Sequence, residues 1–435
     1  MTTPRRGPPG RGAGAPQHGQ GSTMAETRST GAKIFDWLKS KMDTAFLILR
    51  NTLPILVVRF GGRTYALVTR FDDVQEVLQR PNVFNVTYAP KIAVIMQGDN
   101  IFLGMRDEPD FTRDKTTMRM AAPRAEAVAR VKPETARITA EVMQPALQRG
   151  RVDLAMELTQ EVTTRLFGAY FGTPGASVKE ISDQARSLFG YMFADLFDDP
   201  DRKTAAEPVA EAMRCYLEAA IAARKKDRGR HDDILERCLQ LQDGGAPGMS
   251  DRQIRNNLIG LIVGALPQPP MVIPQLFDVL LDRKKELAEA QAAARADDDA
   301  AVSRYVFEAS RFFPLTPGLF RNCEESYRVA AGTLRARTIP KGAFVMAATR
   351  SAMFDGRRVA NPRRFVPGRP DYQYMHFGYG MHECFGLYMN RVMIPEICKA
   401  VLKLPDLRRA RGADGTLRMD EDFGIFPMNL TVEFG

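Results

Sequence analysis

The chain has 435 residues, of which 44% are hydrophobic and 26% are charged, and its formal net charge at pH 7 is +9. This composition is that of an ordinary globular protein and excludes collagen-like and coiled-coil classes. The five cysteines are scattered without Cys-x-x-Cys spacing, which argues against a disulfide framework or a structural zinc site and favours a reducing, cytoplasmic location. Basic residues are dispersed and no nucleic-acid-binding motif accompanies them, so we expect no nucleic-acid partner.

The N-terminal segment is rich in Gly, Pro and Arg and has almost no large apolar residue. It cannot offset the entropy cost of ordering, so residues 1–31 are predicted to be a disordered tail that precedes the folded part, 32–435. The most apolar run that follows is AFLILRNTLPILVV, which contains Arg50, Asn51 and Pro54. It is shorter than the roughly 20 residues that a membrane span needs, so no span is predicted.

Short strands and then helices are predicted along the first two thirds of the chain. The runs ILVVRF and RTYALV flank Gly61 and Gly62, which predicts a β-hairpin, and the helical pattern FDDVQEVLQR follows. Across 122–239, apolar residues recur at intervals of three to four, which indicates several helices. Ser250 is placed to cap a further helix that starts near Asp251.

The last third of the chain combines helices with short strands. The helical pattern SRYVFEASRFF ends before Pro314, and short strands and turns follow it. A glycine-rich loop then leads into a last helix, predicted from Cys384 to about Leu402. The predicted fold class is therefore mainly α with small β-sheets (α+β).

The glycine-rich loop FGYGMHECFG is the most informative stretch. Gly378 and Gly380 precede Cys384, and Gly386 follows it, at the entrance to an apolar helical pattern. Glycines let the backbone fold closely around the sulfur, and a cysteine at a helix start is expected to favour the thiolate. A protein presents a thiolate to a metal in this way. The alternative is a buried structural cysteine beside a glycine turn.

This loop resembles the heme-binding loop of the cytochrome P450 superfamily, which reads Phe-x-x-Gly-x-(Arg or His)-x-Cys-x-Gly. The residues that fill its positions are Phe377, Gly380, His382, Cys384 and Gly386. By this resemblance Cys384 is the proximal iron ligand, Phe377 packs beside the sulfur and His382 faces a heme propionate. The resemblance implies the cytochrome P450 fold for 32–435 as one heme-binding domain, heme b (iron protoporphyrin IX) as cofactor, and a soluble, bacterial-type enzyme.

A second motif lies upstream of this loop. Glu308 and Arg311 stand three residues apart, and Pro314 and Arg321 follow. On an exposed helix such an ion pair would contribute only about 0.2 to 0.5 kcal/mol. In the superfamily, however, Glu-x-x-Arg followed by Pro marks the helix that locks the heme-side core. Arg321 is similar to the family's basic contact to a propionate, and NPRRFVPGR (361–369) resembles its meander.

A weaker resemblance covers RDEPDFTRDK, which is similar to the family's Asp-x-Pro-x-His-x-x-x-Arg region near the heme propionates. Phe111 stands where His is usual, and Lys115 stands where Arg is usual. A lysine can still pair with a carboxylate as a point charge, although it lacks the fork geometry of arginine. Lys115 is therefore a predicted heme contact.

The segment that resembles the family's distal helix departs most from its pattern. Members that split dioxygen usually carry Gly-x-(Asp or Glu)-Thr there, an acid and an alcohol that relay protons. Here Gly264 and Ala265 match the small pair that makes room for oxygen, while Pro267 replaces the acid and Gln268 the alcohol. Gly264, Ala265 and Gln268 are the predicted catalytic residues. The prolines of PQPPMVIP are expected to kink or break the helix, at about 3 kcal/mol each.

Three functions are compatible with these motifs. The main one is a heme-thiolate oxidoreductase that oxidises an apolar small molecule and uses peroxide or a hydroperoxide better than dioxygen. In support, Ala265 to Gln268 resembles the Ala-Asn-x-Gln string of fungal fatty-acid hydroperoxide isomerases. The second is an ordinary monooxygenase that receives electrons from an acidic ferredoxin, docked on Arg357, Arg358, Arg363 and Arg364. The third is a non-catalytic heme-binding protein in a biosynthetic complex. The segments 89–102 and 188–197 either close an apolar pocket or belong to the core.

Overall fold

The computed structural model describes residues 30–435, with side chains from residue 41 onward. Residues up to Phe46 and residues from Leu47 onward form two units, and the second holds every element after helix α1 (Thr30–Thr52). The predicted disordered tail over residues 1–31 lies outside the described residues, except for Thr30 and Gly31, which begin α1, so the prediction was wrong for these two residues. The sequence patterns did not predict this helix.

Helices make up most of the second unit. They are α2 (Phe71–Leu78), α3 (Ala89–Ile95), α4 (Pro109–Ala121), α5 (Lys132–Arg149), α6 (Glu161–Phe171), α7 (Val178–Phe189), α8 (Pro200–Lys226), α9 (Ile234–Asp243), α10 (Asp251–Ala265), α11 (Gln268–Leu281), α12 (Lys284–Arg295), α13 (Asp299–Phe312), α14 (Thr349–Ala352) and α15 (Leu387–Leu402). The strands are β1 (Ile55–Phe60), β2 (Arg63–Val68), β3 (Phe84–Val86), β4 (Arg151–Asp153), β5 (Leu319–Cys323), β6 (Tyr327–Val329), β7 (Arg337–Ile339), β8 (Phe344–Ala347), β9 (Arg408–Arg409), β10 (Arg418–Met419), β11 (Pro427–Asn429) and β12 (Thr431–Glu433). The predicted class, mainly α with small β-sheets, is confirmed.

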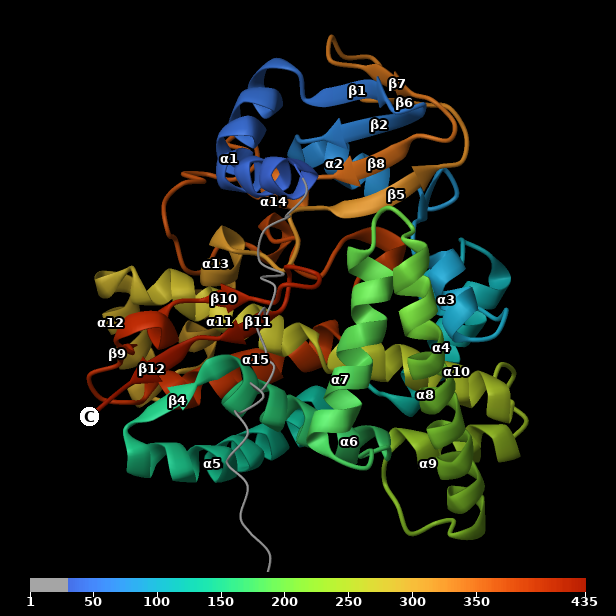
Figure 1. Ribbon diagram of the computed structural model, residues 1–435, viewed down its shortest axis with the longest axis vertical. Coiled ribbons are helices and arrows are strands. Elements are labelled where there is room, and N and C mark those ends of the chain that lie inside the picture. The colour runs from blue at the N-terminus through green and yellow to red at the C-terminus, as the bar shows by residue number, and fades with distance from the viewer. Residues whose placement is uncertain (1–29) are drawn as a thin grey trace, which may run out of the picture. The chain divides into compact units, whose positions relative to one another are not determined.

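The largest sheet joins the N-terminal hairpin to strands from late in the chain. Its strand order is β1-β2-β8-β5-β3, and these strands lie side by side at one end of the unit (Figure 1). The predicted hairpin is confirmed, since Ile55 pairs with Val68. Gly61 and Gly62 have φ values of +56° and +79°, the left-handed values that a tight two-residue turn requires. β8 runs parallel to β2, so residues 63–68 and 344–347 share one hydrophobic core.

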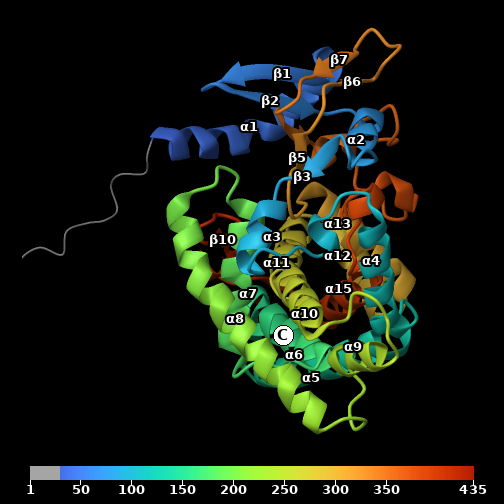
Figure 2. The same ribbon diagram turned by 90° about the vertical axis from the view of Figure 1, so that its right-hand side faces the viewer.

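The helical part is organised around α10 and α11, which follow one another through its middle (Figure 2). Ser250 caps α10 as predicted, because its side chain accepts from the Gln253 N–H while the Gln253 side chain accepts from the Ser250 N–H. Residues 251–281 are long and apolar enough to cross a membrane by length and composition, yet 67% of their most apolar window is buried inside the protein. In this fold they are a core helix pair.

The predicted break in this helix occurs at Leu266 and Pro267, between α10 and α11. Both residues keep right-handed helical angles, with φ of −70° and −76°, so the chain continues in almost the same direction. Pro269 and Pro270 lie in the first turn of α11, where backbone N–H groups have no helical partner, and proline is tolerated there. The expectation that all four prolines are costly was therefore wrong, because Pro274 alone occupies a helix interior.

A buried carboxylate, that of Glu308 on α13, ties the helical part to the loop that leads to the cysteine. Glu308 and Arg311 are both 0% exposed, and the Arg311 guanidinium lies 2.7 Å from the Glu308 carboxylate. Arg369 donates to the same carboxylate at 3.2 Å, and Tyr374 donates its hydroxyl at 2.9 Å. The predicted pairing of the Glu-x-x-Arg motif with the meander is thus confirmed.

The two arginines of this network also hold the meander backbone. Arg311 donates to the carbonyl oxygens of Pro362 (2.7 Å) and Arg364 (3.1 Å), and Arg369 donates to that of Asn361 (3.0 Å). A fully buried charge is tolerated only when it is paired and hydrogen-bonded, and here each charged group has several partners. The network therefore fixes a loop that has little regular structure of its own.

We predict that Glu308→Ala destabilises the protein by about 3 to 5 kcal/mol, because it leaves two buried guanidinium groups without their carboxylate. Arg311→Ala should act similarly. The matched control is Glu289→Ala, which removes an exposed carboxylate that pairs with Tyr305, and it should cost under about 0.5 kcal/mol. Urea unfolding measures both variants. Equal stability of the Glu308 and Glu289 variants would contradict the structural role of the network.

Candidate functional site

The cysteine loop is a tight turn before α15. The Cys384 N–H donates to the carbonyl of Phe377 (2.8 Å), and the Leu387 N–H donates to the carbonyl of Cys384 (3.2 Å). α15 begins at Leu387 with Gly386 as its N-terminal cap, so the helix starts three residues later than predicted. The reason is that Cys384 to Gly386 are part of the turn that closes the loop.

At two glycines of the loop, a side chain would come close to neighbouring atoms. Gly380 has a φ of +75°, and a Cβ atom there would lie 2.8 Å from the carbonyl oxygen of Leu78. A Cβ on Gly386 would lie 3.7 Å from the sulfur of Cys384 and 3.2 Å from the amide nitrogen of Asn390. Gly380 therefore allows close approach to the backbone of Leu78 and not to the sulfur, and Gly386 alone of the two adjoins the sulfur, at an ordinary contact distance. That the glycines let the backbone fold around the sulfur stays a prediction.

The electrostatics around Cys384 differ from the prediction. Burial raises the pKa of the Cys384 thiol, although the Gly386 N–H and the positive charges of Arg119 and Lys115 act in the opposite direction. The expectation that the helix start by itself favours the thiolate was therefore wrong, because the helix begins one turn later and desolvation is the larger effect. A buried thiol of this kind loses its proton when a cation binds the sulfur.

Two cations on α4 hold the loop on either side of Cys384. Lys115 donates from Nζ to the carbonyl of Met381 (2.8 Å), and Arg119 donates to the carbonyl of Phe385 (2.7 Å). The Arg119 guanidinium also lies 3.8 Å from the centre of the Phe385 ring, a cation–π distance. The sequence motifs did not indicate Arg119. Its place one helical turn after Lys115, on the same face of α4, was the available signal.

A buried positive surface surrounds the cysteine. Arg321 on β5 is 4% exposed, donates to the carbonyl of Phe320 (2.8 Å), and forms no ion pair with another described residue. Both ring nitrogens of His382 are buried without a hydrogen-bond partner among the described residues. Burial, with the charges of Arg321 and Lys115, lowers the pKa of His382 to about 3. Phe111, in the predicted histidine position, meets the His382 ring edge-on at 5.9 Å.

This arrangement fits the heme group that the loop sequence implies. A buried guanidinium and a buried imidazole without acceptors are costly unless an anionic ligand pairs with them, and two propionate carboxylates supply that charge. Arg321, His382 and Lys115 would hold the propionates, and Cys384 would supply a thiolate to the iron. Phe377 packs against Phe307 at 5.9 Å between ring centres, which fixes the start of the loop.

The residues predicted for the distal side of the site lie at the break between α10 and α11. A Cβ atom on Gly264 would have no heavy atom within 4 Å, so open space adjoins this residue. Gln268 lies one helical turn later on the same face, is half-buried, and forms no hydrogen bond with another described residue. The segment Ile101–Phe102 links the two sides, since Ile101 packs on Gly260 and Phe102 packs on Phe385 at 5.1 Å between ring centres.

Pro267, in the predicted acid position, is buried. It borders a cavity of about 20 Å³ together with the polar side chains of Gln160, Ser182 and Arg186. A space of this size holds about one water molecule. Arg186 donates to the sulfur of Met428 at 3.3 Å and has no carboxylate partner among the described residues.

The two segments expected to line a pocket or the core are joined to each other. Lys91 on α3 lies 2.7 Å from the carboxylate of Asp195, and both residues are buried. Tyr88 and Phe193 meet at 4.9 Å between ring centres. Burial raises the pKa of Tyr88 to about 12, and Tyr88 is close enough to Arg321 and Cys384 for their charges to act on it. These segments therefore approach the cysteine site as well as the core.

The four arginines predicted to dock a partner differ in their surroundings. Arg357 lies 3.0 Å from the carboxylate of Asp355, and Arg358 lies 2.8 Å from that of Asp72. The side chains of Arg363 and Arg364 are exposed and form no hydrogen bond or ion pair with a described residue. The charge available to a partner is thus concentrated on the second pair.

No family model matches the chain, but individual known proteins are similar to it. The chain is 25% identical to cyclomarin C epoxidase CymV of Salinispora arenicola over 62% of this chain and 64% of that protein. It is 25% identical to cytochrome P450 107B1 of Saccharopolyspora erythraea over 83% and 87%. It is also 29% identical to a bifunctional dioxygenase–epoxy alcohol synthase of Fusarium oxysporum, over 47% of this chain and 17% of that protein.

Solved structures agree with these relatives. The structure of P450BioI in complex with an acyl carrier protein ligated to hexadec-9Z-enoic acid has a TM-score of 0.78, with 18% identity, and covers 92% of this chain and 99% of that chain. The structure of cytochrome P450 TbtJ1 has a TM-score of 0.71, with 20% identity, and covers 93% and 98%. Fold, loop sequence and relatives agree, and the chain belongs to the cytochrome P450 superfamily of heme-thiolate oxidoreductases.

Proposed function

We propose that this protein oxidises an apolar small molecule, with Cys384 as the proximal iron ligand of heme b, and that it uses hydrogen peroxide or an organic hydroperoxide better than dioxygen. The observation that supports this choice of oxidant is the pair Pro267 and Gln268 at the break between α10 and α11. When bound, the heme supplies the oxidation chemistry, and the protein supplies binding, orientation and protons.

The proximal residues have separate tasks in this proposal. Cys384 binds the iron through its sulfur, and the Gly386 N–H donates to that sulfur. Lys115 and Arg119 keep the loop in place through the carbonyl groups of Met381 and Phe385. Arg321 and His382 bind the propionates, which orients the group relative to the cysteine.

On the distal side the chain lacks a proton donor in the predicted positions. Pro267 has no side-chain proton to give, and a carboxamide such as Gln268 does not act as an acid near neutral pH. Splitting dioxygen needs two electrons from a donor and protons delivered in order, whereas a hydroperoxide enters with its O–O bond already formed. With hydrogen peroxide, one oxygen atom passes to the substrate and the other leaves as water, so no external electrons are consumed.

Gln268 is suited to hold such an oxidant. Its carboxamide offers two N–H donors and a carbonyl acceptor, and none of them is hydrogen-bonded to another described residue. Gly264 keeps the adjoining space open. The amide can therefore accept from the O–H of a hydroperoxide while donating to the neighbouring oxygen, which positions the reactant. The partial likeness to the fungal epoxy alcohol synthase supports this proposal.

A ferredoxin-dependent monooxygenase is the second candidate, because relatives of the chain are named as epoxidases and hydroxylases. The cavity beside Pro267 favours it as well. One water molecule there would have Ser182, Gln160 and Arg186 as hydrogen-bonding neighbours and could replace the missing acid as a source of protons. In this candidate function the electron donor is an acidic ferredoxin, and the protein works in the cytoplasm.

One prediction of this proposal concerns the proximal iron ligand. Cys384→Ala should abolish the thiolate-type Soret band of the ferrous carbon monoxide complex, because the other described cysteines lie outside the cysteine loop. The buried cysteines Cys323 and Cys398 serve as controls, and their alanine variants should keep this band. Retention of the thiolate-type band by the Cys384 variant would contradict the assignment.

The second prediction concerns Arg119. Arg119→Gln removes a positive charge near the sulfur, so the reduction potential of the holoprotein should fall by tens of millivolts, measured by spectroelectrochemistry. Arg119→Lys keeps the charge and should keep most of the potential, although it loses the fork geometry. Identical potentials for wild type and Arg119→Gln would show that Arg119 only packs against Phe385.

The third prediction concerns Gln268. Gln268→Leu should reduce peroxide-driven product formation roughly tenfold or more while heme content stays constant, because a positioned hydrogen-bonding group is lost. Gln275→Leu is the matched control, since Gln275 is a buried amide two turns further along α11. The control should retain wild-type rates. Equal rates for both variants would remove Gln268 from the site.

A further inference from the structure

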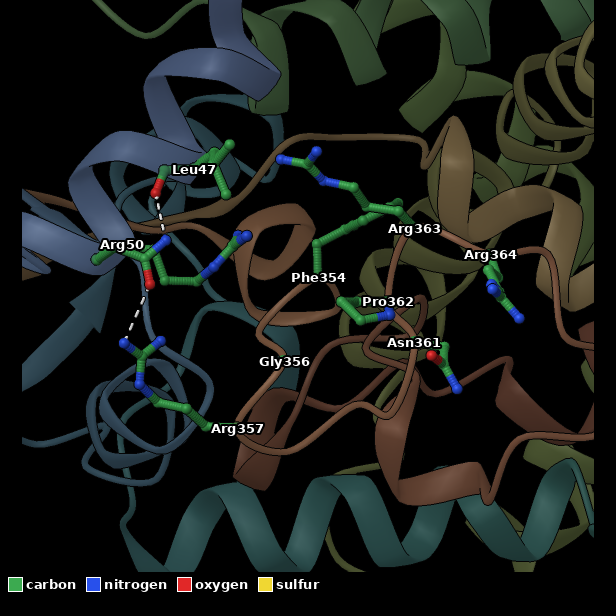
Figure 3. A pocket seen from close by; sticks show the side chains of 10 residues that line it. Leu47, Arg50, Phe354, Gly356, Arg357, Asn361, Pro362, Arg363 and Arg364 are labelled. Atoms are coloured by element: carbon green, nitrogen blue, oxygen red, sulfur yellow. Dashed lines mark hydrogen bonds between the residues drawn. The ribbon is translucent and has the colours of Figure 1, made fainter.

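Guanidinium groups without a carboxylate partner lie in two kinds of surroundings. On the surface, Arg363 extends toward the end of α1 and Arg364 points away from it (Figure 3), and both are exposed to water. Arg321, in contrast, is 4% exposed and donates to the carbonyl of Phe320, with no carboxylate among the described residues as partner. A buried charge needs polar partners. The side chains around Arg321 therefore indicate what binds beside it.

Strand pairing brings Tyr88 close to Arg321. β3 runs antiparallel to β5, and Val86 pairs with Arg321. Residues two apart on a strand point to the same face, and diagonal neighbours across an antiparallel pair lie about 7 to 8 Å apart. Tyr88 follows Val86 by two residues, between the end of β3 and the start of α3. Its phenol is near enough to Arg321 for that charge to act on it.

The Tyr88 side chain is held in place while its hydroxyl stays available. The ring meets Phe193 edge-on at 4.9 Å between ring centres. The Tyr88 carbonyl accepts from the N–H groups of Lys91 (3.1 Å) and Ile92 (3.0 Å), which fixes the backbone. The hydroxyl forms no hydrogen bond with another described residue. Burial raises the pKa of Tyr88 to about 12, so the phenol keeps its proton near neutral pH and can donate it.

The chain lacks one hydrogen-bond donor that the family motif has near the heme propionates. Phe111 stands in the histidine position and contacts His382 through its ring, which cannot donate a hydrogen bond. A carboxylate oxygen in a buried site needs donors as well as charge. We propose that the Tyr88 hydroxyl donates to a heme propionate beside Arg321 and so replaces the missing histidine. The inference rests on the heme of the proposed function and not on the choice of oxidant.

This hydrogen bond has a consequence for the segments that approach the cysteine site. Tyr88 is the N-terminal cap residue of α3. One turn later, Lys91 lies 2.7 Å from the carboxylate of Asp195, and both side chains are buried. A donor on Tyr88 therefore fastens α3, and through the ion pair also the segment 190–195, to the cofactor. Loss of the hydroxyl should loosen the cofactor without removing any charge from the protein.

The test compares wild-type holoprotein with Tyr88→Phe, which removes only the hydroxyl oxygen. Heme transfer to excess apomyoglobin should become about tenfold faster, because a hydrogen bond to a charged group is lost. The propionate bending band in the resonance Raman spectrum should shift, which a loss of packing alone would not cause. The matched control is Tyr191→Phe, a buried phenol on the segment 190–194 that the charges of Arg321 and Cys384 do not reach. It should change the transfer rate by less than about twofold.

Three outcomes would overturn the proposal. The first is an unchanged transfer rate and Raman band in Tyr88→Phe, and the second is equal acceleration by Tyr191→Phe. The third is weaker binding of a carbonyl-bearing apolar substrate to Tyr88→Phe while heme transfer stays at the wild-type rate, which would assign the hydroxyl to the substrate. The ferrous carbon monoxide spectrum separates these results from a failure of the heme assignment, because that failure would remove the thiolate-type band from the wild type itself.

Discussion

The buried carboxylate of Glu308 is the interaction on which the rest of the structure depends. It forms ion pairs with both Arg311 and Arg369 and accepts a hydrogen bond from Tyr374, and the two arginines in turn donate to backbone carbonyls of the meander. Without it, two charges would stay unpaired in the core, at a cost of several kcal/mol. The meander leads directly into the cysteine loop, so one ionic network positions the backbone that precedes Cys384.

The break between α10 and α11 shows how several prolines are accommodated without disrupting a fold. Placing Pro267, Pro269 and Pro270 at the cap and first turn of a new helix avoids the loss of helical hydrogen bonds from their own amides. The axis therefore continues. Pro267 and Gln268 stand where the family resemblance predicts an acid and an alcohol, and they carry an alkyl ring and a carboxamide instead. In the proposed function this segment therefore supplies no acidic proton.

Local patterns were enough to predict the hairpin at Gly61 and Gly62, the cap at Ser250 and the glycine-framed loop, because each depends on neighbours in the sequence. The motif of Glu308 and Arg311 indicated the core network only through a family resemblance, since its partners lie about 50 to 60 residues away. The raised pKa of Cys384 and the role of Arg119 could not be predicted, because both depend on burial and on contacts between α4 and the loop. Helix α1 also went unpredicted.

We propose that this enzyme has a thiolate-type heme site without an efficient distal proton supply. The decisive experiment measures product formed per electron consumed, with dioxygen and a reductant, beside the yield from hydrogen peroxide on the same apolar substrate. We expect a low yield per electron, with most electrons recovered as hydrogen peroxide, and a faster reaction when peroxide is supplied. Tightly coupled hydroxylation from dioxygen, with no peroxide-driven product, would contradict it.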